Sequence, residues 1–348
     1  MRPTITDVAK RANTTVATVS RVINNSAYVS PGIRGNVEVA IKELAYVPNA
    51  HARSLKTNKS TTLGVVVGDF NNLSSIRLAE SIRVVGAQYG YTTFMATADE
   101  NAASEGPVIE AFHRQRVAGI VVATMSTDSS QEIIERIVSH LTPIVLIGRG
   151  EDSVKVDSVA ANFRQGGVNA TKHLIHLGHR RIAFVGATLA DADRIARVRG
   201  YVDALNDSGL PVREDYILGD HATRQTPRHS TDAVGYHVAM ELLRRSDRPT
   251  AIFARNDHTA FGVMQAAREL GMRIPQDLSV VGFDDVPLAS ETNPGLTTIR
   301  QPIAQQGQKA AEFLLSRIEK PTDVQEPRKV MLDCELVVRG STAALPNA

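Results

Sequence analysis

The stretch TITDVAKRANTTVATVSRVINN, residues 4–25, carries two short helical patterns separated by a turn. Thr4 and Asp7 have the spacing of a capping box, and the apolar residues after Thr4 recur every three or four positions. Asn13 stands where a tight turn needs a residue that tolerates left-handed backbone. Thr15 has the side chain of a second N-cap. The stretch therefore predicts a helix, a tight turn and a second helix.

The second predicted helix has two different faces. Val19 and Val22 face a small core, whereas Val16 and Ala17 are left at the exposed tip. Small apolar side chains there suit contact with base edges in a DNA major groove, and Arg21 can donate two hydrogen bonds to a guanine, although it can also contact only a phosphate. The expected DNA contacts in this region are Thr6, Thr15, Val16, Ala17, Thr18, Ser20, Arg21 and Asn24.

A third helical pattern starts at Ser30-Pro31, which has the form of a cap followed by a first-turn proline. Its apolar residues fall on one stripe, formed by Ile33, Val37, Ile41 and Leu44. A helix with such a stripe is expected to close the small core over the first two helices. These helices predict an all-α head.

A short helical segment, AHARSLK, follows the head at residues 50–56. At about seven residues it is too short to survive as an isolated helix in water, so DNA, a partner chain or both must order it. Arg53, Leu55 and Lys56 suit an apolar wedge flanked by phosphate anchors in a minor groove. Leu55 can alternatively be a plain packing residue.

Charge is divided unevenly along the 348 residues. The net charge is +2, but the first 60 residues hold nine Lys or Arg against three Asp or Glu, a net of +6, which leaves −4 for the rest. A positive head attracts phosphates, and a mildly acidic body avoids them. The chain shows no signal segment or membrane-length apolar run, and its single cysteine, Cys334, allows no internal disulfide, so we expect a cytoplasmic protein.

After residue 60, continuous apolar runs alternate with helical patterns, as in TLGVVVGDF, VAGIVVAT, TAIFARND and LSVVGFDD. Runs of this kind are typical of parallel strands covered on both faces, and two series of them predict two α/β lobes. Ligands of such sheets collect beyond the carboxyl ends of the strands. The candidate ligand residues at these ends are Asp69, Phe70, Asn71, Arg149, Asn256, Asp257 and Asp284.

The chain resembles the LacI/GalR family of repressors. The resemblance is carried by DVAKRA, TVSRVIN, IKELAYVPNAHARSL, ARNDHTAFG and SVVGFDDVPLASETNPGLTTIRQP, which occur in this order along nearly the whole chain. It implies a two-lobed body like a type I periplasmic binding protein, a homodimer on a near-palindromic operator, and a Leu55 that enters the minor groove. Most relatives of this kind are repressors, and an inducer is more frequent among them than a corepressor.

The resemblance also implies domain boundaries. The head would occupy residues 1–48 and the hinge 49–60. The N-terminal lobe would consist of 61–161 and 294–322, and the C-terminal lobe of 162–293 and 323–348. Pro294-Gly295 and Pro321 are the breakers expected at the last two crossings between the lobes.

Arg197 occupies the position of the family's effector-binding arginine. The expected effector contacts are Asp69, Phe70, Asn71, Arg149, Arg197, His221, Asn256, Asp257 and Asp284. Carboxylates, amides and a guanidinium in a cleft suit a polyhydroxyl effector, namely a sugar, a sugar derivative or a nucleoside. Asp284 can instead cap the following turn, and Arg149 can merely bridge the cleft.

Two departures from the family's pattern bear on the effector. Asn72-Leu73-Ser74-Ser75 stands where many relatives have an aromatic pair, and His221 stands where relatives place a stacking aromatic. The chain also has no tryptophan. A saturated sugar ring or a polyol is therefore favoured over a flat purine, although Phe70, Phe253 and Phe283 can still supply a face.

Several other functions find no support in the residues. Glycine-rich motifs for a dinucleotide or a nucleoside triphosphate are absent. His173, His176 and His179 do not share one helix face, so we expect no metal, and no cofactor or catalytic set is evident. An enzyme and a sugar-transport component remain the alternatives to a ligand-responsive transcriptional repressor. The short tail RGSTAALPNA lacks a heptad pattern, which favours a dimer over a tetramer.

Overall fold

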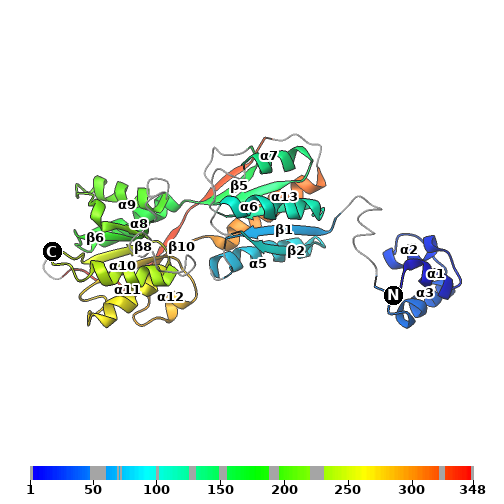
Figure 1. Cartoon of the computed structure of the whole chain (residues 1–348), viewed down its shortest axis with the longest axis horizontal. Coiled ribbons are helices and arrows are strands. Elements are labelled where there is room, and N and C mark those ends of the chain that lie inside the picture. Colours follow the sequence, from blue (N-terminus) through cyan, green and yellow to red (C-terminus); the bar gives the residue numbers. More distant parts are fainter. Residues whose placement is uncertain are drawn as a thin grey trace. The chain divides into compact units, whose positions relative to one another are not determined.

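A computed structural model of the chain describes residues 3–47, 60–68, 70, 73–98, 102–124, 131–148, 155–187, 196–219, 231–320 and 326–345. The chain divides into two compact units, Met1–Thr61 and Thr62–Ala348. Figure 1 shows the helices of the first unit and the two lobes of the second.

The first unit is a helical head made of α1 (Ile5–Arg11), α2 (Val16–Asn24) and α3 (Pro31–Glu43). The capping box is confirmed, because Asp7 Oδ2 accepts from the Thr4 backbone N–H at 2.8 Å and Thr4 Oγ1 accepts from the Asp7 N–H at 3.3 Å. Asn13 has the expected positive φ of 49°. Thr15 Oγ1 accepts from the Thr18 N–H at 3.2 Å and so caps α2. The predicted helix-turn-helix is confirmed.

The third helix differs from the prediction in two details. Ser30 occupies the N-cap position but forms no side-chain cap hydrogen bond. Ile33 is 41% exposed, whereas Val37 and Ala40 are buried against Val8 and Val19. The core stripe of α3 therefore starts one turn later than predicted, because the first turn of this helix extends beyond the small core.

The first lobe is a parallel sheet with helices on both faces. Its strands lie in the order β11-β5-β4-β3-β1-β2. Their bounds are β1 Thr62–Val67, β2 Thr92–Thr97, β3 Gly119–Ala123, β4 Ile144–Ile147, β5 Asp157–Ala161 and β11 Lys329–Leu332. One face packs against α5 (Leu73–Gln88) and α13 (Ile303–Glu319), and the other packs against α6 (Ala102–Arg114) and α7 (Gln131–Ser139).

The second lobe repeats this arrangement. Its strands lie in the order β12-β10-β9-β8-β6-β7, all parallel except β12, which runs antiparallel to β10. Their bounds are β6 Ile182–Ala187, β7 Ile217–Gly219, β8 Ala251–Ala254, β9 Ser279–Asp284, β10 Thr297–Arg300 and β12 Glu335–Val337.

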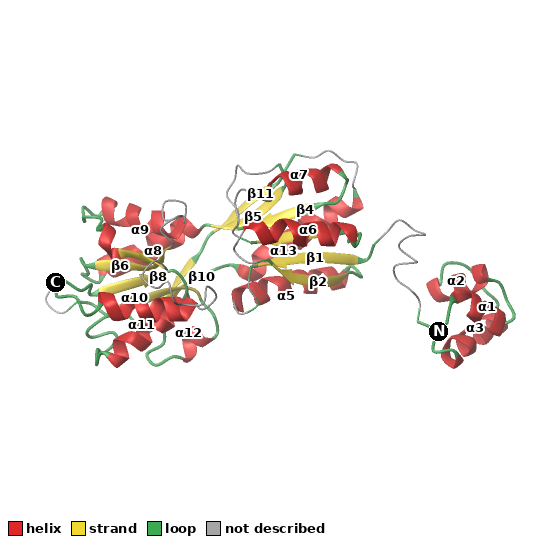
Figure 2. Cartoon of the chain, viewed as in Figure 1, coloured by secondary structure: helices red, strands yellow, loops and turns green. Residues whose placement is uncertain are grey.

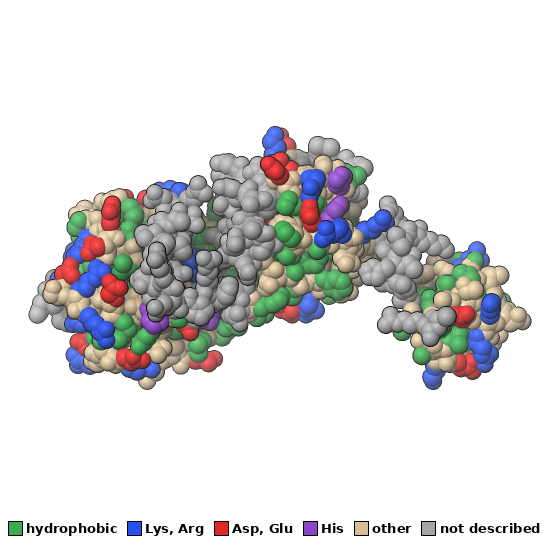
Figure 3. All heavy atoms as spheres, viewed as in Figure 1, with side chains coloured by type: hydrophobic (Ala, Val, Ile, Leu, Met, Phe, Trp, Pro, Cys, Tyr) green, Lys and Arg blue, Asp and Glu red, His purple; other side chains and the backbone are tan. Residues whose placement is uncertain are grey.

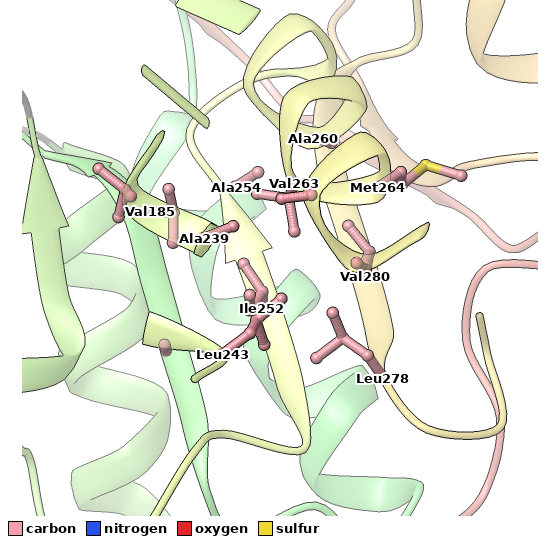
Figure 4. Packing of buried hydrophobic residues seen from close by; sticks show 14 of the residues in the cluster. Val185, Ala239, Leu243, Ile252, Ala254, Ala260, Val263, Met264, Leu278 and Val280 are labelled. Atoms are coloured by element: carbon pink, nitrogen blue, oxygen red, sulfur yellow. The ribbon is translucent and has the colours of Figure 1, made fainter. Parts of the chain in front are cut away.

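Helices also cover both faces of the second sheet. Figure 2 shows α8 (Phe163–His176) and α9 (Ala196–Asp207) on one side, and α10 (Thr231–Leu242) and α11 (Asp257–Glu269) on the other. The shorter elements are the 3-10 helix η1 (Glu214–Tyr216) and α12 (Leu288–Glu291). Figure 4 shows how Ile252 of β8, Val280 of β9 and Val263 of α11 pack within one of the two cores of this lobe.

The predicted crossings between the lobes require two corrections. Residues 297–300 form β10 in the second sheet, so the chain returns to the first lobe after Arg300 and not at residue 293. Residues 329–332 form β11 in the first sheet, so the expected assignment of all of 323–348 to the second lobe is wrong. Pro294-Gly295 lies between α12 and β10, inside the second lobe, and the last crossing falls at Asp333-Cys334.

The histidines considered for a metal contribute to packing. His179 is buried, and its ring nitrogens form hydrogen bonds with Thr250 Oγ1 at 2.9 Å and Ser279 Oγ at 3.0 Å. His173 Nε2 forms one with Thr342 Oγ1 at 3.0 Å. These contacts tie α8 and the residues after it to the end of the chain. Within the ranges that the structure describes, no helix combines the length and the apolar composition of a membrane span.

Candidate functional site

The exposed face of α2 is the candidate DNA-reading surface. Val16 is 39% exposed, and Ala17 and Arg21 are exposed as well. In the described part of the head, Arg21 forms no ion pair, whereas Arg11 pairs with Glu43 at 2.6 Å. The guanidinium of Arg21 is thus not neutralised within the head and can donate both of its parallel N–H groups outward.

Other predicted DNA contacts on the head use part of their hydrogen-bonding capacity internally. Thr15 and Thr18 share the helix cap, with their hydroxyl oxygens 3.0 Å apart. Asn24 Nδ2 donates to the Ser20 carbonyl oxygen at 2.8 Å, so its amide folds back on its own helix. Thr6 lies exposed on α1. The side chains at the tip of α2 are therefore better placed for base contact than Asn24.

The predicted hinge contacts lie outside the described residues. This applies to Arg53, Leu55 and Lys56. Four of the predicted effector contacts also lie outside them, namely Asp69, Asn71, Arg149 and His221.

Asp284, the last residue of β9, is the centre of the candidate ligand site. Its side chain is buried, and its φ of 116° is unusual for a residue with a Cβ. Gln301 Nε2 donates to Asp284 Oδ1. Burial raises the pKa of Asp284, and the charge of Arg197, the hydrogen bond from Gln301 and the nearby hydroxyl of Ser74 oppose this rise. Such a strained, buried carboxylate at a strand end is typical of a functional site.

Arg197 supplies the positive charge opposite Asp284. Its guanidinium carbon lies 4.6 Å from the ring centre of Phe163 and 4.5 Å from that of Phe283, so two aromatic rings hold it in place. Arg197 is the second residue of α9. Gly167 of α8 allows the two helices to pack closely at this point, because a Cβ on Gly167 would collide with the Arg197 carbonyl. The sequence therefore positions Arg197 through a glycine and two phenylalanines.

The site lies where the two lobes meet. Ser74, in the first turn of α5, belongs to the first lobe and interacts with Asp284 of the second. One turn further along α5, Arg77 Nη1 donates to the Asp285 carbonyl oxygen at 3.3 Å. Gln301 stands on the segment that crosses between the lobes, directly after β10. A ligand that contacts this group would therefore touch both lobes and a connection between them.

Asn256 and Asp257 take part in structural hydrogen bonds at the start of α11. Asn256 Oδ1 accepts from the Thr259 N–H at 2.9 Å and caps the helix. Asp257 is completely buried; its Oδ2 accepts from the Val286 N–H at 2.8 Å and its Oδ1 from Thr298 Oγ1 at 2.5 Å. The carboxyl of Asp257 turns inward and holds the segment behind Asp284, and its contact with an effector stays a prediction.

Burial and the neighbouring charge of Asp284 raise the pKa of Asp257 to about 8. The carboxyl is thus largely protonated at neutral pH. Complete burial costs a neutral carboxyl little free energy when it is hydrogen-bonded, whereas it costs a carboxylate without a cationic partner a great deal.

Aromatic surface at the site is scarce. Phe253 and Phe283 have no exposed surface, so the expectation that either can stack on a ligand is wrong. Phe70, which follows β1, is 44% exposed. Of the three phenylalanines considered, only Phe70 can present a ring face.

Sequence reasoning missed several residues of this site. Ser74, Phe163, His258 and Gln301 surround Asp284 or Arg197. Gln301 directly follows β10, at the point where the chain leaves the second sheet. Had β10 been predicted, Gln301 would have counted as a residue at a strand end and so as a candidate ligand contact. The resemblance to relatives already drew attention to the stretch Asn72–Ser75, but it did not single out Ser74, because only the packing of the lobes brings α5 to β9.

Comparisons with known proteins agree with this architecture. A model described as bacterial regulatory proteins, lacI family, matches residues 4–49, and one for a periplasmic binding protein-like domain matches residues 171–342. Catabolite control protein A of Priestia megaterium is 35% identical over 324 residues, which cover 92% of this chain and 94% of that protein.

Solved structures show the same fold. A Lac repressor dimer bound to operator and an anti-inducer matches with a TM-score of 0.84 and 26% identity, over 99% of this chain and 100% of that one. A complex of the transcriptional regulator CelR with cellobiose matches with a TM-score of 0.70 and 30% identity, over 98% and 100%.

A helix-turn-helix head followed by a two-lobed ligand-binding body defines a DNA-binding transcriptional regulator, not an enzyme. The chain belongs to the lacI family of bacterial regulatory proteins. The predicted family and fold class, an all-α head with a two-lobed parallel α/β body, are confirmed.

Proposed function

We propose that this regulator represses carbohydrate-related genes by binding a near-palindromic operator as a homodimer. The observation that carries the proposal is the exposed tip of α2, where Val16 and Ala17 stand beside the unneutralised charge of Arg21. An exposed apolar tip has no benefit for solubility, but it fits base edges and thymine methyl groups in a major groove. The similar Lac repressor dimer is bound to its operator, which supports the same interpretation.

A salt-dependent shift assay on palindromic and scrambled DNA tests DNA recognition. Arg21→Ala should relax the preference at one base pair, at a cost of about 1–3 kcal/mol. Lys10→Ala, an exposed residue of α1, is the matched control and should weaken binding to all DNA alike. Equal affinity for both DNAs at physiological salt would refute the proposal.

The homodimer is supported by an apolar surface on the first lobe. On α5, Ile76 is 40% exposed and Val84 43%, and on the edge strand β2, Phe94 is 52% exposed and Met95 38%. Figure 3 shows hydrophobic side chains gathered over this part of the lobe. An uncovered edge strand with large apolar side chains is typical of an interface. Sedimentation should give a dimer, which Val84→Glu with Phe94→Glu converts to a monomer; a stable tetramer would contradict the proposal.

The paired hinge segments 49–60 would complete the DNA contact. We propose that Leu55 enters the minor groove at the operator centre, with Arg53 and Lys56 on the flanking phosphates. The positive charge of the first 60 residues supports this role. Leu55→Ala should lower operator affinity while leaving the folding of the head unchanged, and unaltered affinity would exclude the wedge.

The effector is a small polyhydroxyl compound bound between the lobes. Asp284 can accept hydrogen bonds from hydroxyl groups, and Arg197 and Gln301 can donate to their oxygens. The faces of Phe163 and Phe283 toward Arg197 are already covered by its guanidinium, so a flat purine finds little stacking surface among the described residues. A saturated sugar or polyol fits best, in line with the cellobiose complex of CelR.

A thermal-shift screen of sugars, sugar phosphates, polyols and nucleosides tests the effector class. A ligand at 100 times its dissociation constant stabilises by about 2.7 kcal/mol. Asp284→Asn should abolish the shift, whereas Asp277→Asn, which changes a partly exposed carboxylate paired with Arg273, should not. Hits confined to aromatic nucleobases would refute the polyhydroxyl class.

Effector binding would change the relative orientation of the lobes and so the spacing of the two hinges. The contacts of Ser74 and Arg77 with the segment Asp284–Asp285 support such coupling, because they join the first lobe to the ligand site. A coupling of about 1–3 kcal/mol changes operator affinity roughly 5- to 150-fold. Since a regulator must reach the DNA that it binds, we propose that this protein acts in the cytoplasm.

A further inference from the structure

A cavity of about 300 Å³ lies in the second lobe, away from the interlobe site. Its floor includes Ile182, the first residue of β6, which is in register with Ala251 and, through it, with Ser279 of β9. Asp284 ends β9 five residues further along, about 16 Å away at the rise of a strand. Since these strands are parallel, the cavity and Asp284 lie at opposite ends of the sheet.

The rim of the cavity carries two arginines that backbone carbonyls hold in place. Arg180 Nη1 donates to the Ile175 oxygen at 3.1 Å and to the His179 oxygen at 3.2 Å. Arg181 Nε donates to the Arg248 oxygen at 3.1 Å. Both guanidiniums are therefore positioned by the fold and keep further N–H groups for a ligand.

A third arginine of the same cavity, Arg213, forms ion pairs that Arg180 and Arg181 do not form with any described residue. Arg213 pairs with Asp215 at 2.7 Å and with Asp247 at 2.5 Å. Over the described ranges of the chain, neither Arg180 nor Arg181 pairs with a carboxylate. Among the described residues, the rim therefore presents two guanidiniums without a carboxylate partner, and an anion is the complementary ligand.

The floor of the cavity is apolar. Tyr201 and Leu205 are buried, and the Tyr201 hydroxyl is already engaged, because it donates to the Ile182 oxygen at 2.8 Å. The apolar surface that a ligand can reach is supplied by Leu210 and Pro211, which lie above these two buried residues. A hydrated inorganic anion would leave this apolar surface in contact with water, whereas a ring or a short alkyl group would bury it and so stabilise the complex.

We propose that this cavity binds a small organic anion, with its carboxylate or phosphate on Arg180 and Arg181 and its apolar body on Leu210 and Pro211. The site is separate from the effector cleft, so it stands whether or not the proposed effector class is correct.

Calorimetric titration of the full-length protein with benzoate tests the proposal, with benzamide as the uncharged match and inorganic phosphate as the anion without an apolar body. We expect saturable benzoate binding and at least tenfold weaker binding of the other two probes. The double variant Arg180→Gln/Arg181→Gln should lose at least tenfold in benzoate affinity. Arg268→Gln, an exposed arginine on α11, should stay within twofold of the parent.

Three outcomes would overturn the proposal. The first is no saturable benzoate binding, and the second is equal affinity in the double variant and the parent. The third is loss of benzoate binding in Arg197→Gln with retention in the double variant, because the probe would then occupy the interlobe site. A circular dichroism melt of each variant verifies that the compared proteins are equally folded.

Discussion

Each lobe contains an aspartate held between two arginines, completely enclosed in the first lobe and mostly buried in the second, and the two clusters have different roles. In the first lobe, Asp157 contacts Arg317 at 2.7 Å and Arg328 at 2.5 Å. In the second lobe, Asp285 contacts Arg300 at 2.7 Å and Arg339 at 2.6 Å. For both carboxyls, burial raises the pKa but the arginine hydrogen bonds outweigh it, so both pKa values lie below the ordinary value.

The difference lies in the backbone that each aspartate stabilises. Asp157 begins a regular strand, and its partners join α13 and the segment before β11 to the edge of the sheet. Asp285 has a φ of 55° and directly follows Asp284 at the ligand site. The same chemistry thus secures the fold in one lobe and a strained, functional turn in the other.

Asp157→Ala should have the largest effect on stability. It leaves two largely buried arginines without their partner, which costs about 3–5 kcal/mol. Urea unfolding of the full chain measures the loss in the body. Effector affinity of the folded fraction should be unchanged, and a loss below about 1 kcal/mol would show that the cluster does not hold the fold.

A third carboxyl, Asp257, should give a pH dependence of opposite sign. Its folded pKa of about 8 lies above the unfolded value of 3.8, so its stabilising contribution is complete below pH 3.8 and is lost as pH rises toward 8. Stability should fall by at most about 1.4 kcal/mol per pH unit in this window. Melting at pH 6 and pH 8 should show this fall in the parent and a smaller one in Asp257→Asn; identical slopes would mean that another group titrates.

Asp285→Asn should cost less stability than Asp157→Ala, about 1–3 kcal/mol, because Arg300 is 48% exposed and water can solvate it after the change. It should also weaken effector binding, because the turn that carries Asp284 loses its anchors. Comparing the effector-induced thermal shift of this variant with that of Asp157→Asn separates the two roles. An unchanged shift in Asp285→Asn would remove the proposed distinction between the clusters.

Arg197→Gln should have the smallest effect on stability and a large effect on binding. The guanidinium gains about 1–2 kcal/mol from the two rings but must remain partly desolvated beside Asp284, so the net change in unfolding free energy is small. Effector affinity should fall more than tenfold. A variant that is strongly destabilised yet binds normally would make Arg197 a packing residue.

The head could be predicted almost completely because its signals are local. The pair Thr4 and Asp7, the turn at Asn13 and the cap at Thr15 each act within four residues. The body was predicted in outline, but β10 was missed because its four residues are too few to show a continuous apolar run. Thr298 is buried by bonding to Asp257, a partner 41 residues away in sequence. Pro294-Gly295 then marked a false boundary.

The candidate ligand site was predicted in part for the same reason. Asp284 and Arg197 follow from strand ends and family position, and both lie in the site. Asp257 equally follows a strand end, yet its side chain turns inward, which spacing along the chain does not reveal. Ser74 enters the site only through contact between the lobes, so the departure at Asn72–Ser75 drew attention to the stretch but not to this residue.

The last strands impose an order on biosynthesis. β11 forms one edge of the first sheet, and β12 forms one edge of the second. Asp157 accepts a hydrogen bond from the backbone N–H of Arg328, which lies 171 residues later in the sequence. Neither lobe can be completed until nearly the whole chain has left the ribosome. The described contacts of the head all join residues within its first 47 positions, so it can fold early, and the nascent protein should be able to bind DNA before it can respond to a ligand.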